Sequence, residues 1–199
     1  MAKTKFYAVK KGNNEGIYTT WDECKKQVLG YKGAIYKSFS TYKEAQDFLN
    51  GVDHLEQVVC DCENKAIAYV DGSYNEVTNE FSYGAVIFYK SQQYEFSEKF
   101  DNENSSMRNV AGEIEGAKMA MQFCIDNDIK GIDIYYDYQG IQNWAEGLWK
   151  TNKLATKEYK QYYDNISKSV RVNFVKVAAH TNNKYNDLAD KLAKKALGI

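Results

Sequence analysis

Hydrophobic and polar residues alternate at the start of the chain and predict the strands of a small α+β unit. Residues 5–12 (KFYAVKKG) alternate and are rich in aromatic and β-branched side chains, which is typical of a strand. The segment GIYTT at 16–20 is predicted to be a short partner, and GAIYKSF at 33–39 is predicted to be the next strand. Two helices between and after these strands would complete a core of workable size.

Two capping boxes mark where those helices begin. Thr20 stands three residues before Glu23, which is the spacing of a capping box, and we expect the helix that it opens to end at Gly30. The segment TYKE at 41–44 has the same pattern and predicts a second helix that runs to about residue 50.

A longer series of alternating and helical patterns follows and predicts a larger α/β unit. Strands are predicted at about 65–72, 81–90, 92–100, 131–137 and 171–180, and helices at about 110–127, 139–146, 155–168 and 185–197. Three consecutive strands that form hairpins, followed by alternating helices and strands, indicate a mixed five-stranded sheet with helices on both faces.

The charge distribution separates the two units. Residues 1–50 carry nine lysines against five acidic residues, whereas residues 51–64 carry four acidic residues and no lysine or arginine. The remaining residues, 65–199, are nearly neutral, with 17 basic and 18 acidic groups. The formal net charge of −1 therefore hides a basic first unit, an acidic linker at 51–64 and a neutral body. The local positive charge permits nucleic-acid binding without requiring it.

Composition is typical of a globular protein: 44% of the residues are hydrophobic and 27% are charged. The chain has no run of about 18 apolar residues and no apolar core of a signal peptide near its start, so we expect no membrane span and a cytoplasmic location. The four cysteines, at 24, 60, 62 and 124, have neither disulfide-framework nor zinc spacing, and we expect reduced, structurally neutral thiols.

Two glutamates in the helix predicted at 110–127 occupy different faces. At about 100° per residue, Glu113 and Glu115 point roughly 200° apart. Glu115 aligns with Lys118 on the solvated side, whereas Glu113 lies at the rim of the apolar stripe that includes Ala117. Glu113 is thus either an edge residue whose carboxylate reaches water or part of a site.

Three aspartates have simple structural explanations when each is taken alone. Asp71 precedes a glycine, and Asp-Gly is a common turn dipeptide. Asp137 follows an apolar strand and precedes a helix, so it is a possible helix cap. Asp190 stands four residues before Lys194, which suits an exposed ion pair.

Taken together with Glu113, these aspartates suggest a metal site. Two of them follow apolar strands, where ligands gather in α/β sheets, and the other two acids lie on helices able to flank those strand ends. Gathered carboxylates repel one another unless cations neutralise them, and oxygen ligands without clustered histidines favour Mg²⁺ or Mn²⁺ over zinc. Two such ions about 4 Å apart would suit an in-line phosphoryl displacement.

Four motifs in this order resemble those of the type 1 ribonuclease H family. They are YVDGSY, GEIEGA, IYYDYQGIQNW and VAAHTNNKYNDLADKLA, and the likeness covers essentially all of residues 65–199. Residues 6–49, beginning FYAVKKGNNEGIYTTWDECKK, resemble the small hybrid-binding domain that often precedes the nuclease. The resemblance implies a ribonuclease H-like sheet at 65–199, a linker at 51–64 and an α+β hybrid-binding domain at 1–50.

The resemblance also implies an activity and a catalytic site. The activity is cleavage of the RNA strand of RNA–DNA hybrids by water, leaving 5′-phosphate and 3′-hydroxyl ends, with two Mg²⁺ ions for which Mn²⁺ can substitute. The metal-binding and catalytic carboxylates carry over as Asp71, Glu113, Asp137 and Asp190. His180 matches a loop histidine that assists proton movement and product release, although a surface-loop histidine would be the expectation without the motif.

Nucleic-acid contacts carry over in both units. In the larger unit Asn109 and Gln139 match polar contacts to the hybrid, and Asn109 also suits the N-cap of its helix. In the smaller unit the family stacks aromatic side chains on DNA and uses lysines, and the matching residues are Tyr7, Trp21, Tyr36 and Lys37. The sequence departs from the family's pattern at Ser38, Val110 and Asp187, where Lys, Asn and Glu are common.

A short basic stretch, WAEGLWKTNK at 144–153, is a candidate handle for the DNA strand, with Trp144 more suited to the core and Trp149 left open. The expected partner is an RNA–DNA hybrid duplex bound by a monomer. Three other functions compete with this one: a non-catalytic hybrid-binding protein, a different nuclease on the same sheet, and a metal-dependent phosphatase. The first requires the loss of one of the four acids, and the other two leave the basic aromatic unit without a role.

Overall fold

The structure is a computed structural model that describes residues 5–39, 41–50, 64–177 and 183–199. The chain divides into two compact units, Met1–Asp61 and Cys62–Ile199. Most of the predicted linker, at 51–63, and the end of the last predicted strand, at 178–182, lie outside the described residues.

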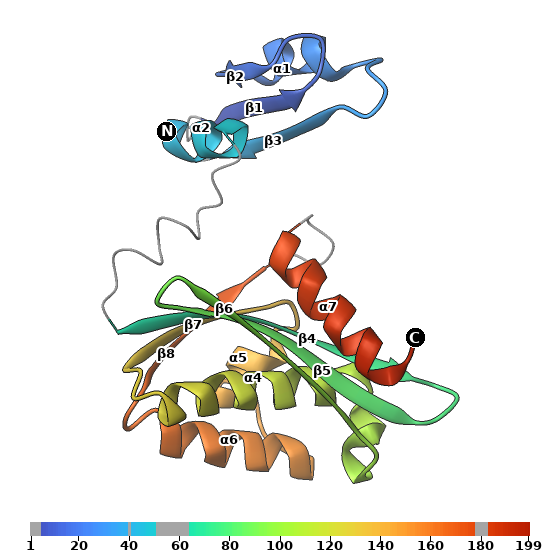
Figure 1. Cartoon of the computed structure of the whole chain (residues 1–199), viewed down its shortest axis with the longest axis vertical. Helices are drawn as coiled ribbons and strands as arrows, with labels where there is room; N and C mark the ends of the chain where they lie inside the picture. Colours follow the sequence, from blue (N-terminus) through green and yellow to red (C-terminus); the bar gives the residue numbers. More distant parts are fainter. Residues whose placement is uncertain (1–4, 40, 51–63, 178–182) are drawn as a thin grey trace. The chain divides into compact units, whose positions relative to one another are not determined.

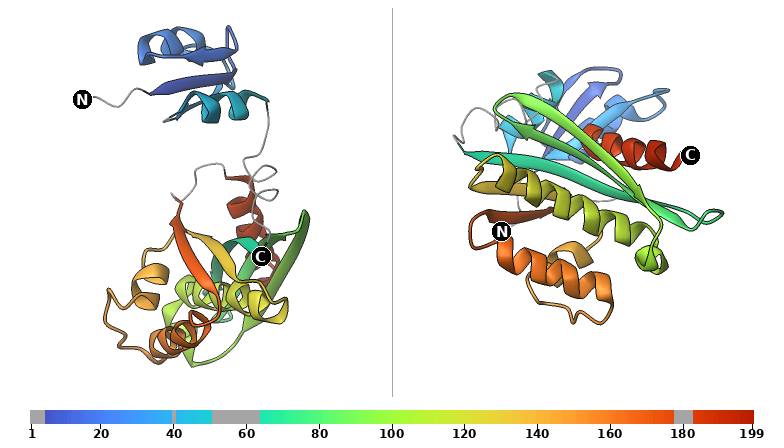
Figure 2. Two further views of the ribbon diagram at one scale, coloured as in Figure 1. Left: turned by 90° about the vertical axis from the view of Figure 1, so that its left-hand side faces the viewer. Right: turned by 60° about the horizontal axis from the view of Figure 1, so that its bottom comes forward.

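The smaller unit is a three-stranded antiparallel sheet with one helix on each face (Figure 2). Its strands lie in the order β2-β1-β3. The elements are β1 (Phe6–Lys11), β2 (Gly16–Tyr18), α1 (Trp21–Val28), β3 (Ile35–Phe39) and α2 (Tyr42–Asn50). Thr20 caps α1 as expected, since its Oγ1 accepts from the Glu23 N–H at 3.3 Å. Val9 packs against Cys24 and Val28 of α1 to form a small core.

The larger unit is built on a mixed five-stranded sheet in the order β6-β5-β4-β7-β8. Its strands are β4 (Lys65–Asn75), β5 (Glu80–Tyr89), β6 (Gln92–Phe100), β7 (Gly131–Tyr136) and β8 (Arg171–Lys176). The first three pair antiparallel, whereas β7 runs parallel to β4 and β8 runs parallel to β7. The predicted five-stranded mixed sheet is confirmed.

Helices cover both faces of this sheet (Figure 1). The helical elements are η1 (Glu103–Met107), α4 (Asn109–Asp126), α5 (Gly140–Ala145), α6 (Leu154–Ile166) and α7 (Lys184–Leu197). Helices α4, α5 and α6 lie on one face and α7 lies on the other, against β4, β5 and β6 (Figure 1). Among the described residues, no helix combines the length and the apolar character needed to cross a membrane.

Two structural explanations that the sequence offered for single residues do not hold. Asp71 does not begin a turn, because β4 continues to Asn75 while β5 pairs with it as far as Asn75↔Glu80. The turn comes later, where the Asn75 side chain accepts from the Val77 N–H. Asn109 is not a helix cap: a single-turn helix, η1, precedes α4, and Arg108 occupies the N-cap position with a φ of 55°.

Side chains alternate between the two faces of β4. Ala66, Ala68 and Val70 belong to the core beneath α4, together with Ile114. Tyr69 faces the other way, where its ring stacks on Tyr135 at 4.5 Å and contacts Tyr185 of α7 at 5.6 Å between centroids. Two residues further along the same face lies Asp71.

Glycines let the helices approach the sheet at backbone distance. A Cβ atom on Gly72 would lie 2.0 Å from the Asn109 carbonyl oxygen of α4, and one on Gly112 would lie 1.9 Å from the Ser82 carbonyl oxygen. On the other face, a Cβ atom on Gly84 would lie 2.0 Å from the Ala189 carbonyl oxygen of α7. These contacts are backbone to backbone, so no side-chain rotation relieves a clash.

Gly72→Ala should therefore separate α4 from β4 and destabilise the larger unit. We expect the free energy of unfolding to fall by about 3 kcal/mol, the upper part of the range for overpacking a tight contact. Gly131→Ala is the matched control, because its Cβ would lie 3.5 Å from the nearest atom, at ordinary contact distance. Chemical denaturation of the three proteins measures the effect, and equal destabilisation by both substitutions would contradict it.

Candidate active site

Two neighbouring parallel strands bring Asp71 and Asp137 together. The register of β4 and β7 ends with the pair Tyr69 and Tyr135. Asp71 and Asp137 follow two residues further along each segment, and their carboxylates lie close together. Strand β7 ends at Tyr136, so both carboxylates lie at the point where β4 loses this neighbour. Helix α5 has Gln139 as its N-cap, which removes the helix-cap explanation for Asp137.

Helix α4 supplies the third carboxylate. Glu113 is 1% exposed, which is deeper than the rim position expected from the helical pattern. Its Oε2 accepts a hydrogen bond from the Tyr138 N–H at 3.3 Å, next to Asp137. Glu115, on the other side of the helix, pairs with Lys118 at 2.9 Å, and its side chain is 21% exposed, which is more buried than expected for the solvated face.

Asp71, Glu113 and Asp137 form a compact acidic cluster. Each offers a carboxylate oxygen, and these oxygens lie within 4.8 Å of one another. Burial, followed by the charge of Asp137, raises the pKa of Asp71 from 3.8 to about 7. Burial, followed by the charges of Asp137 and Asp71, raises the pKa of Glu113 from 4.5 to about 9. Buried oxygen donors that repel one another suit a hard divalent cation.

Asp190 lies beside this cluster without joining its three oxygens. Its Oδ2 is 2.7 Å from the Lys194 Nζ, so the exposed pair suggested by the sequence is present. Its charge nevertheless contributes to raising the pKa of Asp71, and Lys194 acts in the opposite direction. The neighbouring Ala189 lies against Gly84 of β5, which fixes this part of α7 on the sheet. His180 lies outside the described residues.

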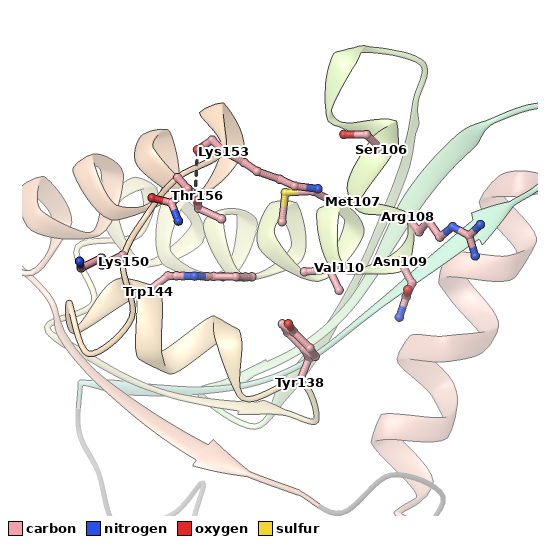
Figure 3. A pocket seen from close by; sticks show the side chains of 11 residues that line it. Ser106, Met107, Arg108, Asn109, Val110, Tyr138, Trp144, Lys150, Lys153 and Thr156 are labelled. Atoms are coloured by element: carbon pink, nitrogen blue, oxygen red, sulfur yellow. Dashed lines mark hydrogen bonds between the residues drawn. The ribbon is translucent and has the colours of Figure 1, made fainter.

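A cavity of about 510 Å³ opens beside the cluster at the start of α4 (Figure 3). Asn109 lines one side of it, Trp144 lies across from Asn109, and Tyr138 lies below and between them in the view (Figure 3). The other lining residues are Ser106, Met107, Arg108, Val110, Lys150, Asn152, Lys153 and Thr156. Gln139 is not in the lining; its Nε2 donates to the Asn143 Oδ1 at 3.2 Å.

The predicted handle contributes to this cavity. Lys150 and Lys153 come from the stretch 144–153, and Trp144 both packs against the core and lines the cavity. Trp149 is partly exposed, and its ring lies 5.8 Å from that of Trp144. No pattern in the sequence indicated that Arg108 and Tyr138 would be part of this surface.

Three of the four residues expected to bind nucleic acid in the smaller unit lie together. The ring of Trp21 lies 5.8 Å from that of Tyr7 and 5.8 Å from that of Tyr36. Trp21 is 43% exposed and Tyr36 is 45% exposed, so both rings are accessible to a ligand. Lys37 follows Tyr36 in β3 and lies on the opposite face of the strand, with its Nζ 5.9 Å from the Phe39 ring centroid.

Two parts of the chain match models of known protein families. Residues 63–198, which contain the acidic cluster and the cavity, match the family model described as RNase H. The chain belongs to the ribonuclease H family. Residues 5–49, which contain the aromatic cluster, match a second model described as the ribonuclease H1 N-terminal domain.

Individual ribonucleases H share different parts of the chain. The protein of Acetivibrio thermocellus is 33% identical over 138 residues, covering 65% of this chain and 92% of its own length. The Saccharomyces cerevisiae protein is 64% identical over 44 residues, covering 22% of this chain but only 13% of its own length. For the first relatives found, from three eukaryotes, the match spans about a quarter of their length or less.

Solved structures support the fold of the larger unit. Ribonuclease H1 of Halobacterium salinarum aligns with a TM-score of 0.56 at 20% identity, covering 67% of this chain and 98% of its own. LC11-RNase H1, isolated from compost and solved in complex with an RNA/DNA hybrid, aligns with a TM-score of 0.53 at 20% identity, covering 66% and 99%.

Asp71→Asn should leave the metal-free ribonuclease H fold as stable as the wild type, or more stable by about 1 kcal/mol, because it removes a repelled buried charge. Millimolar Mg²⁺ should then raise the melting temperature of the wild type more than that of the variant. Thermal melts in EDTA and in Mg²⁺ measure both effects, with Asp101→Asn as an exposed control outside the cluster. A variant that melts far below the wild type in EDTA would make Asp71 a structural residue.

The same cluster predicts a pH dependence for the metal-free protein. The folded state keeps protons on Asp71 up to about pH 7 and on Glu113 up to about pH 9, whereas the unfolded chain releases them near 3.8 and 4.5. Between these values the folded state holds more protons, so the free energy of unfolding falls as pH rises. Denaturation in EDTA from pH 5 to pH 9 should show this fall, reduced in Asp71→Asn; stability that rises with pH throughout would refute the assignment.

Proposed function

We propose that the chain is an endonuclease that hydrolyses the RNA strand of RNA–DNA hybrids. The observation that carries this proposal is the acidic cluster of Asp71, Glu113 and Asp137, because a ribonuclease H fold with these donors converging offers a phosphodiester a metal-dependent site. The relatives found are named ribonuclease H, and one solved neighbour was studied with an RNA/DNA hybrid.

The cluster suits two Mg²⁺ ions, with Mn²⁺ as a substitute. Asp71, Glu113, Asp137 and Asp190 would hold them, since all four offer oxygen and none is replaced by nitrogen or sulfur. When bound, the ions supply charge stabilisation for the attacking and leaving oxygens of an in-line displacement. Products with a 5′-phosphate and a 3′-hydroxyl follow when water attacks the phosphate and the 3′-oxygen leaves.

The chain's own residues contribute position and proton transfer. The Tyr138 N–H holds the Glu113 carboxylate at the end of β7, beside Asp137. We assign His180 the role of carrying a proton near the leaving group and aiding product release, on the strength of the family motif alone. Asp190 is held toward Lys194 and must turn toward Asp71 to complete the metal site.

Hybrid recognition is divided between the units in this proposal. Asn109 and Gln139 contact the duplex near the cut, and the cavity that includes Trp144 and Lys150 accepts the uncleaved strand. The 2′-hydroxyl groups distinguish RNA from DNA, since no other group differs along the strand backbones.

The smaller unit, which we place at 1–50 with a linker at 51–64 and the nuclease at 65–199, adds affinity. Trp21 and Tyr36 offer exposed rings for stacking, the partly buried Tyr7 lies beside Trp21, and Lys37 adds a charge at the sheet edge. We propose that the protein acts as a monomer in the cytoplasm.

The direct test uses labelled RNA–DNA hybrid, double-stranded RNA and double-stranded DNA, each with Mg²⁺ or with EDTA. We expect the RNA strand of the hybrid to be cleaved in Mg²⁺ and to stay intact in EDTA. The mobility of the products on a sequencing gel should identify a 5′-phosphate. Asp137→Asn should lower kcat by at least about a thousandfold if it holds a required cation. Hybrid that is bound but never cut would instead identify a non-catalytic hybrid-binding protein.

Trp21→Ala should weaken hybrid binding without abolishing cleavage, because base–aromatic stacking contributes about 1–3 kcal/mol per base and the acidic cluster belongs to the other unit. We expect KM to rise about tenfold with kcat nearly unchanged. Tyr42→Ala, at an exposed aromatic outside the Trp21 cluster, is the control and should leave KM unchanged. A hundredfold loss of kcat at constant KM would contradict this division of labour.

A further inference from the structure

Arg108 occupies an unusual position at the start of α4. It is one of two arginines in the chain, which otherwise relies on lysine for positive charge. Its φ of 55° is a conformation that glycine adopts freely and that other residues adopt rarely. A positive φ is costly for an arginine, so an interaction of its side chain would offset that cost.

The guanidinium is held by aromatic and acidic neighbours on the β4–β5 hairpin. It lies 5.7 Å from the Tyr74 ring centroid, and the Tyr74 hydroxyl is fixed by donating to the Asn79 Oδ1 at 2.8 Å. A guanidinium on an aromatic face keeps its N–H groups directed outward in the plane, where they suit a bidentate anion.

Glu76 supplies that anion in the absence of a ligand. Its Oε1 lies 3.1 Å from the Arg108 Nη1, and the two side chains are 74% and 65% exposed. An ion pair so exposed contributes little to folding stability. The Glu76 carboxylate therefore occupies the Arg108 guanidinium, but the hairpin does not need this ion pair to stay in place.

Arg108 also lines the cavity beside the acidic cluster, next to Asn109. Figure 3 shows its side chain directed outward at the opposite end of the cavity from Lys150. A nucleic-acid backbone that follows the cavity past Asn109 would bring a phosphate to the guanidinium. A phosphate carries oxygens that can replace the Glu76 Oε1 at the guanidinium and accept from two of its N–H groups.

We propose that Arg108 is a nucleic-acid phosphate contact that Glu76 occupies in the free protein and releases to the hybrid. This inference rests on the proposed function, because it takes the RNA–DNA hybrid as the ligand. Glu76 acts as an internal competitor: it keeps the guanidinium on Tyr74, ready for a phosphate, and makes each phosphate that binds displace a carboxylate. Removing Glu76 should thus tighten binding, which is the opposite of what loss of a structural contact would do.

The experiment measures the Kd for a labelled RNA–DNA hybrid over a range of KCl concentrations. The full chain carries Asp137→Asn throughout, so that the hybrid remains intact. Arg108→Ala, Glu76→Gln and the double variant are compared with Glu80→Gln, which removes another acid of the hairpin, one that is 20% exposed and paired with Lys99. Arg108→Gly is a second truncation, because glycine adopts the positive φ without strain.

We expect Arg108→Ala and Arg108→Gly to weaken binding about fivefold, the scale of one exposed ion pair. They should also reduce the slope of log Kd against log salt by about 1. Glu76→Gln should tighten binding about twofold, and the double variant should bind like Arg108→Ala. Glu80→Gln should bind like the parent protein.

Two results would overturn the proposal. In one, both Arg108 variants keep the parent's Kd and salt slope. In the other, Glu76→Gln tightens binding equally with and without Arg108, which would make Glu76 a general negative charge. Failure of the proposed function is separate, because it appears as an intact hybrid in the Mg²⁺ assay of the wild-type protein, whatever these variants do.

Discussion

The contact between the backbones of β4 and α4 is the constraint on which the site depends. Gly72 lies against the Asn109 carbonyl and Gly112 lies against the Ser82 carbonyl, so the first turns of α4 rest directly on the sheet. A helix held away by side chains would leave Glu113 outside the gap beside β7. With the helix this close, the Glu113 carboxylate reaches the Tyr138 N–H and the two aspartates, one on β4 and one just after β7. The same contact places Asn109 and Arg108 at the mouth of the cavity.

The acidic cluster lowers the folding stability of the metal-free protein. Three carboxylates are brought within 4.8 Å, and burial and mutual repulsion raise the pKa values of Asp71 and Glu113 far above those of free side chains. The apolar side of α4, with Ile114, Ala117 and Met121 in the core, holds the helix down against that repulsion. A divalent cation relieves the repulsion, so metal binding and folding stability are coupled through the same three side chains.

Local sequence patterns predicted the features of the fold that are set within one helix or strand. Helical spacing separated Glu113 from Glu115, and the structure buries the first and leaves the second with Lys118. The Asp71–Gly72 dipeptide is a turn signal, but pairing with the next strand, β5, extends β4 past it to Asn75. The η1 helix and the φ of Arg108 have no periodic pattern to reveal them. The cavity joins three separate segments, at 106–110, at 138–144 and at 150–156, so only the tertiary structure shows that Arg108 and Lys150 share it.

A net charge of −1 is no obstacle to binding a polyanion, because charges act here over short distances. At physiological ionic strength the screening length is about 8 Å, so a phosphate responds to the residues nearest to it. Around the cavity these include Arg108, Lys150 and Lys153, while the cluster beside them is negative and attracts cations. Metal-dependent phosphodiester chemistry requires an anionic centre for the metal and a cationic rim for the nucleic-acid backbone. Neighbouring side chains meet both requirements here. Glu76 adds to this arrangement, because its carboxylate neutralises the Arg108 guanidinium until a phosphate of the hybrid displaces it.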